Sequence, residues 1–244
     1  MTEELFRQDA YAPDCSALVV ARVTGDDGSR GVVLDRTVFY PTGGGQPGDQ
    51  GHLIPEGSDT LTVTDTRTDG DGQIVHWLAP GIEAPAEGTP LTAAINWDRR
   101  HRLMRMHTCL HLLCSLIEGG VTGGSIGEEK GRLDFDLPEG APDKQALTDR
   151  LNALVAANHP LDIRWITDGE LEAQPELIRT MSVKPPTGSG RVRLVEIAGV
   201  DLQPCGGTHV RATGEIGLVR VSKIEKKGKM NRRVTVVFED KVPH

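Results

Sequence analysis

The chain has 244 residues, of which 37% are hydrophobic and 25% are charged, a composition typical of soluble globular proteins. Its N-terminus lacks an apolar segment, and no apolar run reaches the ~20 residues that a transmembrane helix needs. The sequence therefore predicts neither a secretory signal nor a membrane association. The four cysteines show no framework spacing, which is typical of a reducing compartment, so a cytoplasmic location is expected.

The net charge of −8 is unevenly distributed along the chain. Residues 1–95 hold 15 acidic side chains against five arginines, a net charge of −10, so residues 96–244 carry +2. Within the second part, residues 220–233 (RVSKIEKKGKMNRR) contain seven Lys or Arg against one Glu. This segregation predicts an acidic domain joined to a domain with basic strips, although such a strip is also typical of a solvated hairpin turn.

The first part of the chain contains five strand-like segments separated by turn clusters such as GDDGSR and DGDG. These segments are residues 16–25, 31–40, 59–68, 72–80 and 89–97. Five short strands at this spacing, without a helical period, predict a small β-barrel or sandwich.

The second part mixes helices and strands. A helix is expected to begin with Asp98 as its N-cap and to end at Gly119-Gly120, because apolar residues recur at helical spacing between them. Further helices are expected at about 142–158 and 169–179. Strands are expected near 161–166, 191–197, 217–225 and 233–239, the last two forming a hairpin around KKGKMN. Without a regular βαβ alternation, this order predicts an α+β fold with domains at 1–95 and 96–244.

Two pairs of potential metal ligands share the same spacing. His107 and His111 lie on one face of the expected helix, although such a pair alone is more often two ordinary histidines. Cys205 and His209 form a second pair in CGGTH, where the two glycines free the backbone to bend. Together they match the ligand types and number of a tetrahedral zinc site. Cys109 is left out because it is rotated by about 200° from His107 on the helix.

Several familiar catalytic motifs are missing. A metalloprotease helix would carry Glu after its first histidine, and here that position is Thr108. We find no nucleophile elbow, Walker loop or dinucleotide fingerprint. The segment GGGQPGD (43–49) lacks the lysine of a phosphate loop, so it is expected to be a tight turn between strands.

Four segments nevertheless resemble a known family, the alanyl-tRNA editing proteins and the editing domain of alanyl-tRNA synthetase. They are YPTGGGQPGDQG (40–51), HTCLH (107–111), GGSIGEEKGRLDFDL (123–137) and VDLQPCGGTHVRATGEIG (200–217). The resemblance covers residues 15–238 in the right order, without a synthetase catalytic domain. It implies a free-standing editing protein of the medium-length type, whose N-terminal domain carries the glycine-rich motif.

The resemblance also implies a fold, a cofactor and an activity. The fold would be a small β-barrel followed by a two-layer α/β domain with an antiparallel sheet, shared with threonyl-tRNA synthetase. One Zn²⁺ per chain would be bound by His107, His111, Cys205 and His209. The activity would be hydrolysis of the ester in mischarged tRNA(Ala), seryl-tRNA(Ala) and often glycyl-tRNA(Ala), in trans. No stable protein partner is evident from the sequence.

The remaining site residues are hypotheses. Thr108, Thr122 and Ser125 are candidates for a hydrogen bond to the seryl hydroxyl, which would let the site refuse alanine. Four protein ligands would close the zinc shell, so either one ligand is replaceable or water is activated elsewhere. Candidate general bases are Glu128, Glu129 and Asp134. For Glu128 and Glu129, an ordinary exposed charge without a catalytic role is an equally good interpretation. Candidate RNA-binding residues are Lys226, Lys227, Lys229, Arg232 and Arg233.

Two other functions remain open from the sequence. One is a zinc-stabilised RNA-binding module without catalysis, for which metal loss would unfold the chain. The other is a zinc hydrolase of a small-molecule ester or amide, for which RNA and the basic hairpin would play no role.

Overall fold

A computed structural model describes residues 2–138, 140–179 and 190–239 of the chain. The fold is of the α+β class, as the sequence predicted, with a closed β-barrel and two further antiparallel sheets. The chain divides into two compact units. The first contains Met1–Gly43 and Pro47–His101, and the second contains Gly44–Gln46 and Arg102–His244. Three residues of the glycine-rich motif thus belong to the second unit.

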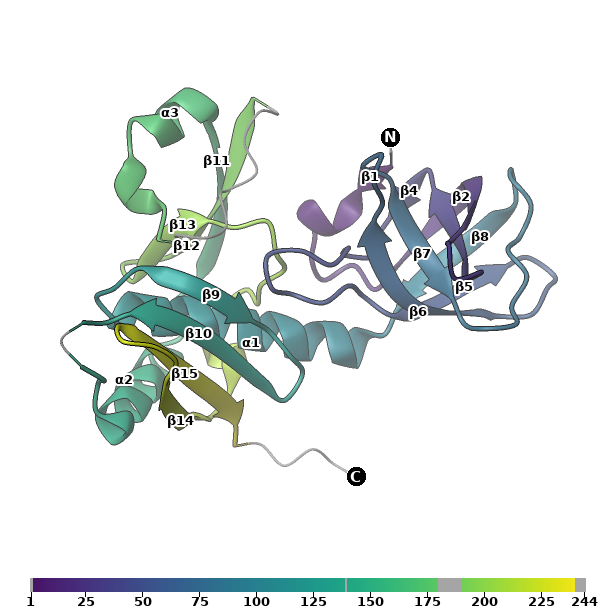
Figure 1. Cartoon of the computed structure of the whole chain (residues 1–244). Coiled ribbons are helices and arrows are strands. Elements are labelled where there is room, and N and C mark those ends of the chain that lie inside the picture. Colours follow the sequence, from purple (N-terminus) through teal and green to yellow (C-terminus); the bar gives the residue numbers. More distant parts are fainter. Residues whose placement is uncertain (1, 139, 180–189, 240–244) are drawn as a thin grey trace. The chain divides into compact units, whose positions relative to one another are not determined.

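The first unit is a six-stranded antiparallel barrel with the strand order β2-β3-β7-β6-β5-β8 (Figure 1). Its strands are β2 (Asp14–Thr24), β3 (Arg30–Leu34), β5 (Gly51–Pro55), β6 (Leu61–Thr68), β7 (Ile74–Leu78) and β8 (Pro90–Ile95). The five predicted segments coincide with strands, and the predicted barrel is confirmed. Strand β5 was not predicted, because GHLIP is short and includes Gly and Pro, which have low strand propensity.

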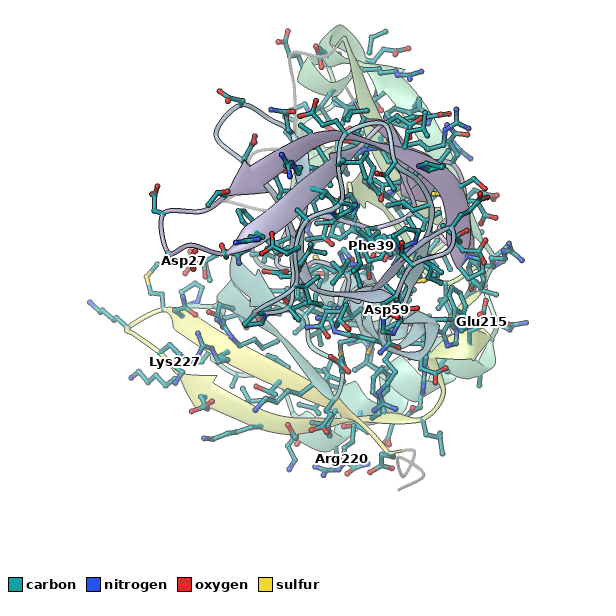
Figure 2. All side chains as sticks on the ribbon, turned by 90° about the vertical axis from the view of Figure 1, so that its right-hand side faces the viewer. Asp27, Phe39, Asp59, Glu215, Arg220 and Lys227 are labelled. Carbon is teal, nitrogen blue, oxygen red and sulfur yellow. The ribbon has the colours of Figure 1, made fainter. Side chains whose placement is uncertain are left out.

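Short elements precede and follow the first barrel strands. The strand β1 (Glu3–Glu4) pairs in parallel with β4 (Arg36–Thr37), and a 3₁₀ turn, η1 (Leu5–Arg7), follows β1. The barrel interior is filled by alternate side chains of its strands and by Phe39, which follows β4 and is labelled in Figure 2. His76 is buried in this unit, with its Nε2 2.8 Å from Thr37 Oγ1. Burial lowers the pKa of His76 to about 4, so it is a neutral core residue.

A buried ion pair joins the barrel to the start of helix α1 (Trp97–Leu116). Arg100 is fully buried and donates to both carboxylate oxygens of Asp49 and to the carbonyls of Val38 and Ala10. The same carboxylate accepts the Tyr40 N–H at 2.7 Å. Removing either partner would leave an uncompensated charge in the interior. Because the pair also hydrogen-bonds the backbone of Val38 and Tyr40, it connects the segment before the glycine-rich motif to Asp49 at the end of the motif.

Helix α1 begins two residues earlier than the sequence predicted. Asn96 Oδ1 accepts the Arg99 N–H at 3.1 Å, which makes Asn96 the capping residue. Asp98 lies in the first turn of the helix instead of at its N-cap, so that prediction was wrong. No helix of the described residues is both long and apolar enough to span a membrane.

The second unit contains a four-stranded antiparallel sheet in the order β14-β15-β10-β9. Its strands are β9 (Val121–Ser125), β10 (Lys130–Asp136), β14 (Val219–Lys226) and β15 (Asn231–Phe238). Helix α1 runs along one face of this sheet, where Gly131 lets Met106 and Leu110 approach the backbone closely (Figure 1). The predicted hairpin is β14–β15, whereas β9 and β10 were not predicted as strands.

Helix α2 (Lys144–Ala156) protects the open edge of this sheet. It buries Leu147, Leu151 and Val155, and its N-cap is Asp143. Asn152 hydrogen-bonds both the N–H and the carbonyl of Val219, and Thr148 Oγ1 accepts the Val221 N–H. The helix therefore satisfies edge groups of β14 that would otherwise be free to pair with another strand.

A second, three-stranded antiparallel sheet has the order β11-β12-β13. Its strands are β11 (Leu161–Thr167), β12 (Arg191–Ile197) and β13 (Asp201–Pro204). One face packs on α3 (Asp168–Glu172), where Leu171, Val192 and Leu194 form a small core. The helix expected at 169–179 is α3 followed by a separate 3₁₀ turn, η2 (Pro175–Leu177), because Pro175 lacks the N–H needed to continue α3. A further 3₁₀ turn, η3, spans Thr213–Ile216.

Candidate metal centre

Four side chains meet at one point in the second unit. His107 and His111 project from α1, and Cys205 and His209 come from the loop after β13, with all four ligand atoms within 4.8 Å of one another. Cys205 Sγ lies 3.2 Å from His209 Nε2 and 3.5 Å from His107 Nε2. A tetrahedral ion bonded at about 2.3 Å to sulfur and about 2.1 Å to nitrogen separates such donors by about 3.6 Å. The cluster can therefore hold a metal ion.

Each histidine of the cluster is oriented by a hydrogen bond at its outer nitrogen, Nδ1. The partners are Gln46 Oε1 for His107 at 2.9 Å, Asp201 Oδ2 for His111 at 2.9 Å, and Thr108 Oγ1 for His209 at 3.1 Å. These contacts leave every Nε2 available at the centre. Such outer partners fix the ring orientation and the tautomer of metal-binding histidines.

The glycine-rich motif supplies one of these partners. Gly44 and Gly45 have positive φ angles of 57° and 82°, which a tight turn here requires and which glycine adopts readily. The turn is tied to the strand β9 region by a hydrogen bond from Ile126 N to Gly45 O. Gln46, which follows, is fully buried and also exchanges hydrogen bonds with Thr208. The turn was predicted from sequence, but the role of Gln46 was not.

The CGGTH loop is held close to the helix. A Cβ atom on Gly207 would lie 2.2 Å from His107 Cε1, so only glycine fits against this imidazole. Arg193, which is buried in β12, donates to the carbonyls of Cys205 and Gly207 at 2.7 and 3.0 Å. Arg193 was not predicted as a site residue, although an arginine inside the apolar pattern RVRLVEI indicates a buried partner.

The electrostatics of the cluster favour binding of a cation. Burial disfavours the Cys205 thiolate, but the neighbouring His107 and His209 outweigh burial and hold the pKa of Cys205 well below its usual range. Burial likewise opposes charge on His111, but hydrogen bonds to Asp201 and Cys205 raise its pKa to about 10. A thiolate among imidazoles is a donor set from which a metal ion displaces protons. Cys109 is fully buried, and burial raises its pKa to about 12.

The three candidate selectivity residues have different environments. Thr108 is buried, and its hydroxyl contacts His209 and the Val210 N–H. Thr122 donates to the Asp134 carbonyl at 3.1 Å and accepts from Asn231 at 2.9 Å. Ser125 is exposed, and its hydroxyl makes no hydrogen bond with the described residues.

The candidate general bases also differ in their surroundings: two line a cleft and the third is bound by arginines. Ser125, Glu128 and Glu129 line a cleft of about 760 Å³ on the second unit, together with Arg102, Lys130 and Arg132. Asp134 is instead bound by Arg132 at 2.7 Å and by Arg233 through two hydrogen bonds of 2.7 and 2.8 Å. The hydrogen bond from Arg233 is the main cause that lowers the pKa of Asp134, against burial. Its carboxylate oxygens are thus occupied by arginines.

The basic hairpin projects its side chains into solvent. Figure 2 shows Lys227 at the β14–β15 turn, where its Nζ lies 3.3 Å from Glu225. Arg233 is bound to Asp134. Lys226 and Lys229 are exposed and form no ion pair with the described residues, and Arg232 contacts only backbone carbonyls among them.

Comparisons with known proteins agree with these features. Residues 192–235 match the family model of the threonyl and alanyl tRNA synthetase second additional domain. Residues 18–99 match that of the class II (A) tRNA synthetases. The chain is 38% identical over 254 residues to the alanyl-tRNA editing protein AlaX-M of Methanosarcina acetivorans, covering 98% of this chain and 100% of that protein. The chain belongs to the alanyl-tRNA editing protein family.

Other relatives are similar over more than nine-tenths of this chain. AlaX-M of Saccharolobus solfataricus is 34% identical, over 96% of this chain and 98% of its own length. The alanine–tRNA ligase of Pyrobaculum aerophilum is 38% identical over 92% of this chain, which corresponds to 25% of the ligase. The resemblance inferred from the sequence motifs is therefore confirmed for both groups of proteins.

The close packing of Gly207 on His107 leads to a prediction about metal binding. We expect Gly207→Ala to weaken binding of a metal ion, with Zn²⁺ as the probe, by roughly 10- to 100-fold, because the methyl group displaces a ring held by its outer hydrogen bond. Binding can be measured by competition with a chromophoric chelator. Gly169→Ala is the control, since a methyl group there meets no atom within 4 Å. Unchanged affinity in a folded Gly207→Ala protein would show that the ring position is not critical.

Proposed function

We propose that this protein is a zinc-dependent deacylase that hydrolyses mischarged tRNA(Ala) in trans in the cytoplasm. The observation that carries the proposal is the cluster of His107, His111, Cys205 and His209 in a chain that matches alanyl-tRNA editing proteins over their full length. We further propose that residues 96–244 form the editing domain and that Gly44–Gln46, which belong to the same compact unit as the metal cluster, support it through Gln46.

The need for such an activity follows from the size of the amino acids. A pocket that accepts alanine cannot reject the smaller glycine strongly, and it also discriminates poorly against serine, which merely adds a hydroxyl. A second site must therefore hydrolyse the wrong esters after they form. We propose seryl-tRNA(Ala) as the main substrate and glycyl-tRNA(Ala) as a second one.

The chain's own residues account for how the site would be organised. Gln46, Asp201 and Thr108 hold the three imidazoles, and Arg193 holds the loop that carries the Cys205 thiolate. When bound, zinc would supply a Lewis acid to the ester carbonyl if one of its four protein ligands gives up its position, because a filled tetrahedral shell has no open site. Because four protein donors complete a tetrahedral shell, we place the proton acceptor outside the cluster. Glu128 and Glu129 suit this role better than Asp134, whose oxygens are held by two arginines.

The first prediction concerns the metal and the ester. Purified protein should deacylate seryl-tRNA(Ala), and a chelator or Cys205→Ala should lower the rate by roughly 100-fold or more, because the metal supplies several kcal/mol of charge stabilisation. Cys114→Ala removes a buried thiol outside the cluster and should retain activity.

The same experiment separates the rival functions. A zinc-stabilised RNA-binding module would bind tRNA, cleave no ester and unfold when the metal is removed. A small-molecule hydrolase would cleave the free seryl ester of adenosine as fast as the tRNA ester.

The second prediction concerns the basic hairpin. If it contacts the RNA backbone, replacing Lys226, Lys227 and Arg232 by Gln should weaken tRNA binding and reduce the slope of log affinity against log salt by about 2 to 3. Replacing Lys144, Arg150 and Arg164, which are also exposed, gives a variant of equal charge change. An equal effect of both triple substitutions would assign the loss to net charge alone.

The third prediction concerns selectivity. Among the three candidates, Ser125 is the one whose hydroxyl makes no hydrogen bond with the described residues, so Ser125→Ala should slow seryl-tRNA(Ala) hydrolysis by roughly 5- to 100-fold, as expected when one hydrogen bond to the substrate is lost. Glycyl- and alanyl-tRNA(Ala) have no side-chain hydroxyl and should be affected much less. Thr122→Val is the comparison, because that hydroxyl already bonds to Asp134 and Asn231. Equal losses on all three esters would exclude hydroxyl recognition by Ser125.

A further inference from the structure

An exposed tryptophan lies on the edge strand of the three-stranded sheet. Trp165 is 44% exposed in β11, in a chain of which only 4% is aromatic. The guanidinium of Arg191 lies over its ring, 4.7 Å from the ring centroid. The small core with Leu171 and Val192 lies on the opposite face of the sheet. On the face of Trp165 the β12 residues Val195 and Ile197 are buried, whereas Trp165 on the edge strand stays exposed.

The strand register places this tryptophan in line with the metal loop. Trp165 is the cross-strand partner of Arg193, and Cys205 N donates to Arg193 O at 3.1 Å on the other side. Cross-strand neighbours share a face of the sheet, so Trp165, Arg193 and Cys205 form one row on the same face. With strands about 4.8 Å apart, the row spans about 10 Å from the tryptophan backbone to the cysteine backbone. This span is about the length of one nucleoside.

The charges around the row are segregated between the two faces. Arg191 and Arg193 share the face of Trp165, because residues two apart on a strand point the same way. The acidic residues of β11 and β12, Asp162 and Glu196, are on the other face, where Glu196 pairs with Arg164. Arg193 is buried and bound to the carbonyls of Cys205 and Gly207. A nucleobase at the exposed end of the row would therefore meet the ring of Trp165 and the guanidinium of Arg191, without a carboxylate of these two strands on that face.

We propose that Trp165, together with Arg191, is a stacking platform for the terminal nucleobase of the tRNA acceptor end, which it places one nucleoside away from the metal centre. This inference rests on the proposed function, since it assumes that an aminoacylated 3′ end reaches the cluster. Unpaired bases at RNA ends are recognised by stacking on aromatic rings and arginine planes. Stacking tolerates any base and needs no hydrogen-bond pattern, so a single ring is sufficient.

Binding of uncharged tRNA(Ala) tests the platform without involving catalysis. Two ligands are compared at fixed salt: the full-length tRNA and the same tRNA lacking its terminal adenosine. Removing the adenosine should weaken binding to the wild-type protein by roughly 5- to 150-fold. Trp165→Ala should weaken binding of the full-length tRNA by a similar factor and leave binding of the shortened tRNA unchanged. Trp165→Tyr should restore most of the loss.

A matched control lies two residues away. Ile163 is 43% exposed on the same face of β11, so Ile163→Ala removes a similar exposed apolar side chain without removing a ring. The platform is overturned if Trp165→Ala weakens both tRNAs equally, if it weakens neither, or if Ile163→Ala has the same effect. It is also overturned if Trp165→Ala instead dissociates a dimer of the chain, which would assign this strand edge to self-association.

The test of the stacking platform can fail or succeed independently of the test of the proposed deacylase activity. Deacylation of seryl-tRNA(Ala) by the wild-type protein is measured in parallel. Coupling between Trp165 and the terminal adenosine without deacylation would uphold the platform and contradict the enzyme. Deacylation without coupling would uphold the enzyme and contradict the platform.

Discussion

The structure of the second unit depends on burying three imidazoles and a thiol around one point. Buried polar groups are costly unless each has a partner, and an imidazole has two nitrogens to satisfy. The inner nitrogens face one another, so the outer ones need acceptors from elsewhere. Gln46, Asp201 and Thr108 meet this requirement from three separate segments of the chain. The glycine-rich turn, strand β13 and helix α1 are consequently all tied to the same site.

Close approach of these segments explains several local features. The turn before Gln46 requires positive φ angles, and the CGGTH loop passes His107 so closely that position 207 has no room for a side chain. Arg193 then secures the loop by binding two of its carbonyls from the adjacent strand. Arg193 is also the cross-strand partner of Trp165, so the residue that binds the metal loop lies next to the edge strand of the sheet.

The charged residues have separate roles that their sequence positions do not reveal. Asp134 and Arg233 were candidates for catalysis and RNA binding, yet each is the other's partner in the sheet. Asp49 and Arg100 form a comparable but fully buried pair in the first unit. Among the described residues, Lys226 and Lys229 near the hairpin turn form no ion pair, and Glu129 lies at the cleft that Glu128 also lines. Nucleic-acid contacts and proton transfer are therefore better sought in these two places.

The sequence by itself determined the α+β class, a first part made of short strands that form a barrel or a sandwich, and the set of four candidate ligands. These follow from local periodicity: strand segments alternate, and residues four apart share a helix face. Only the tertiary structure decided how the ligands are supported, because Gln46 is 61 residues from His107 and Asp201 is 90 from His111. It also decided that Asp98 is not the cap of α1 and that β5 completes the barrel. Contacts across such separations leave no periodic signal, since they arise from packing between segments and not within one.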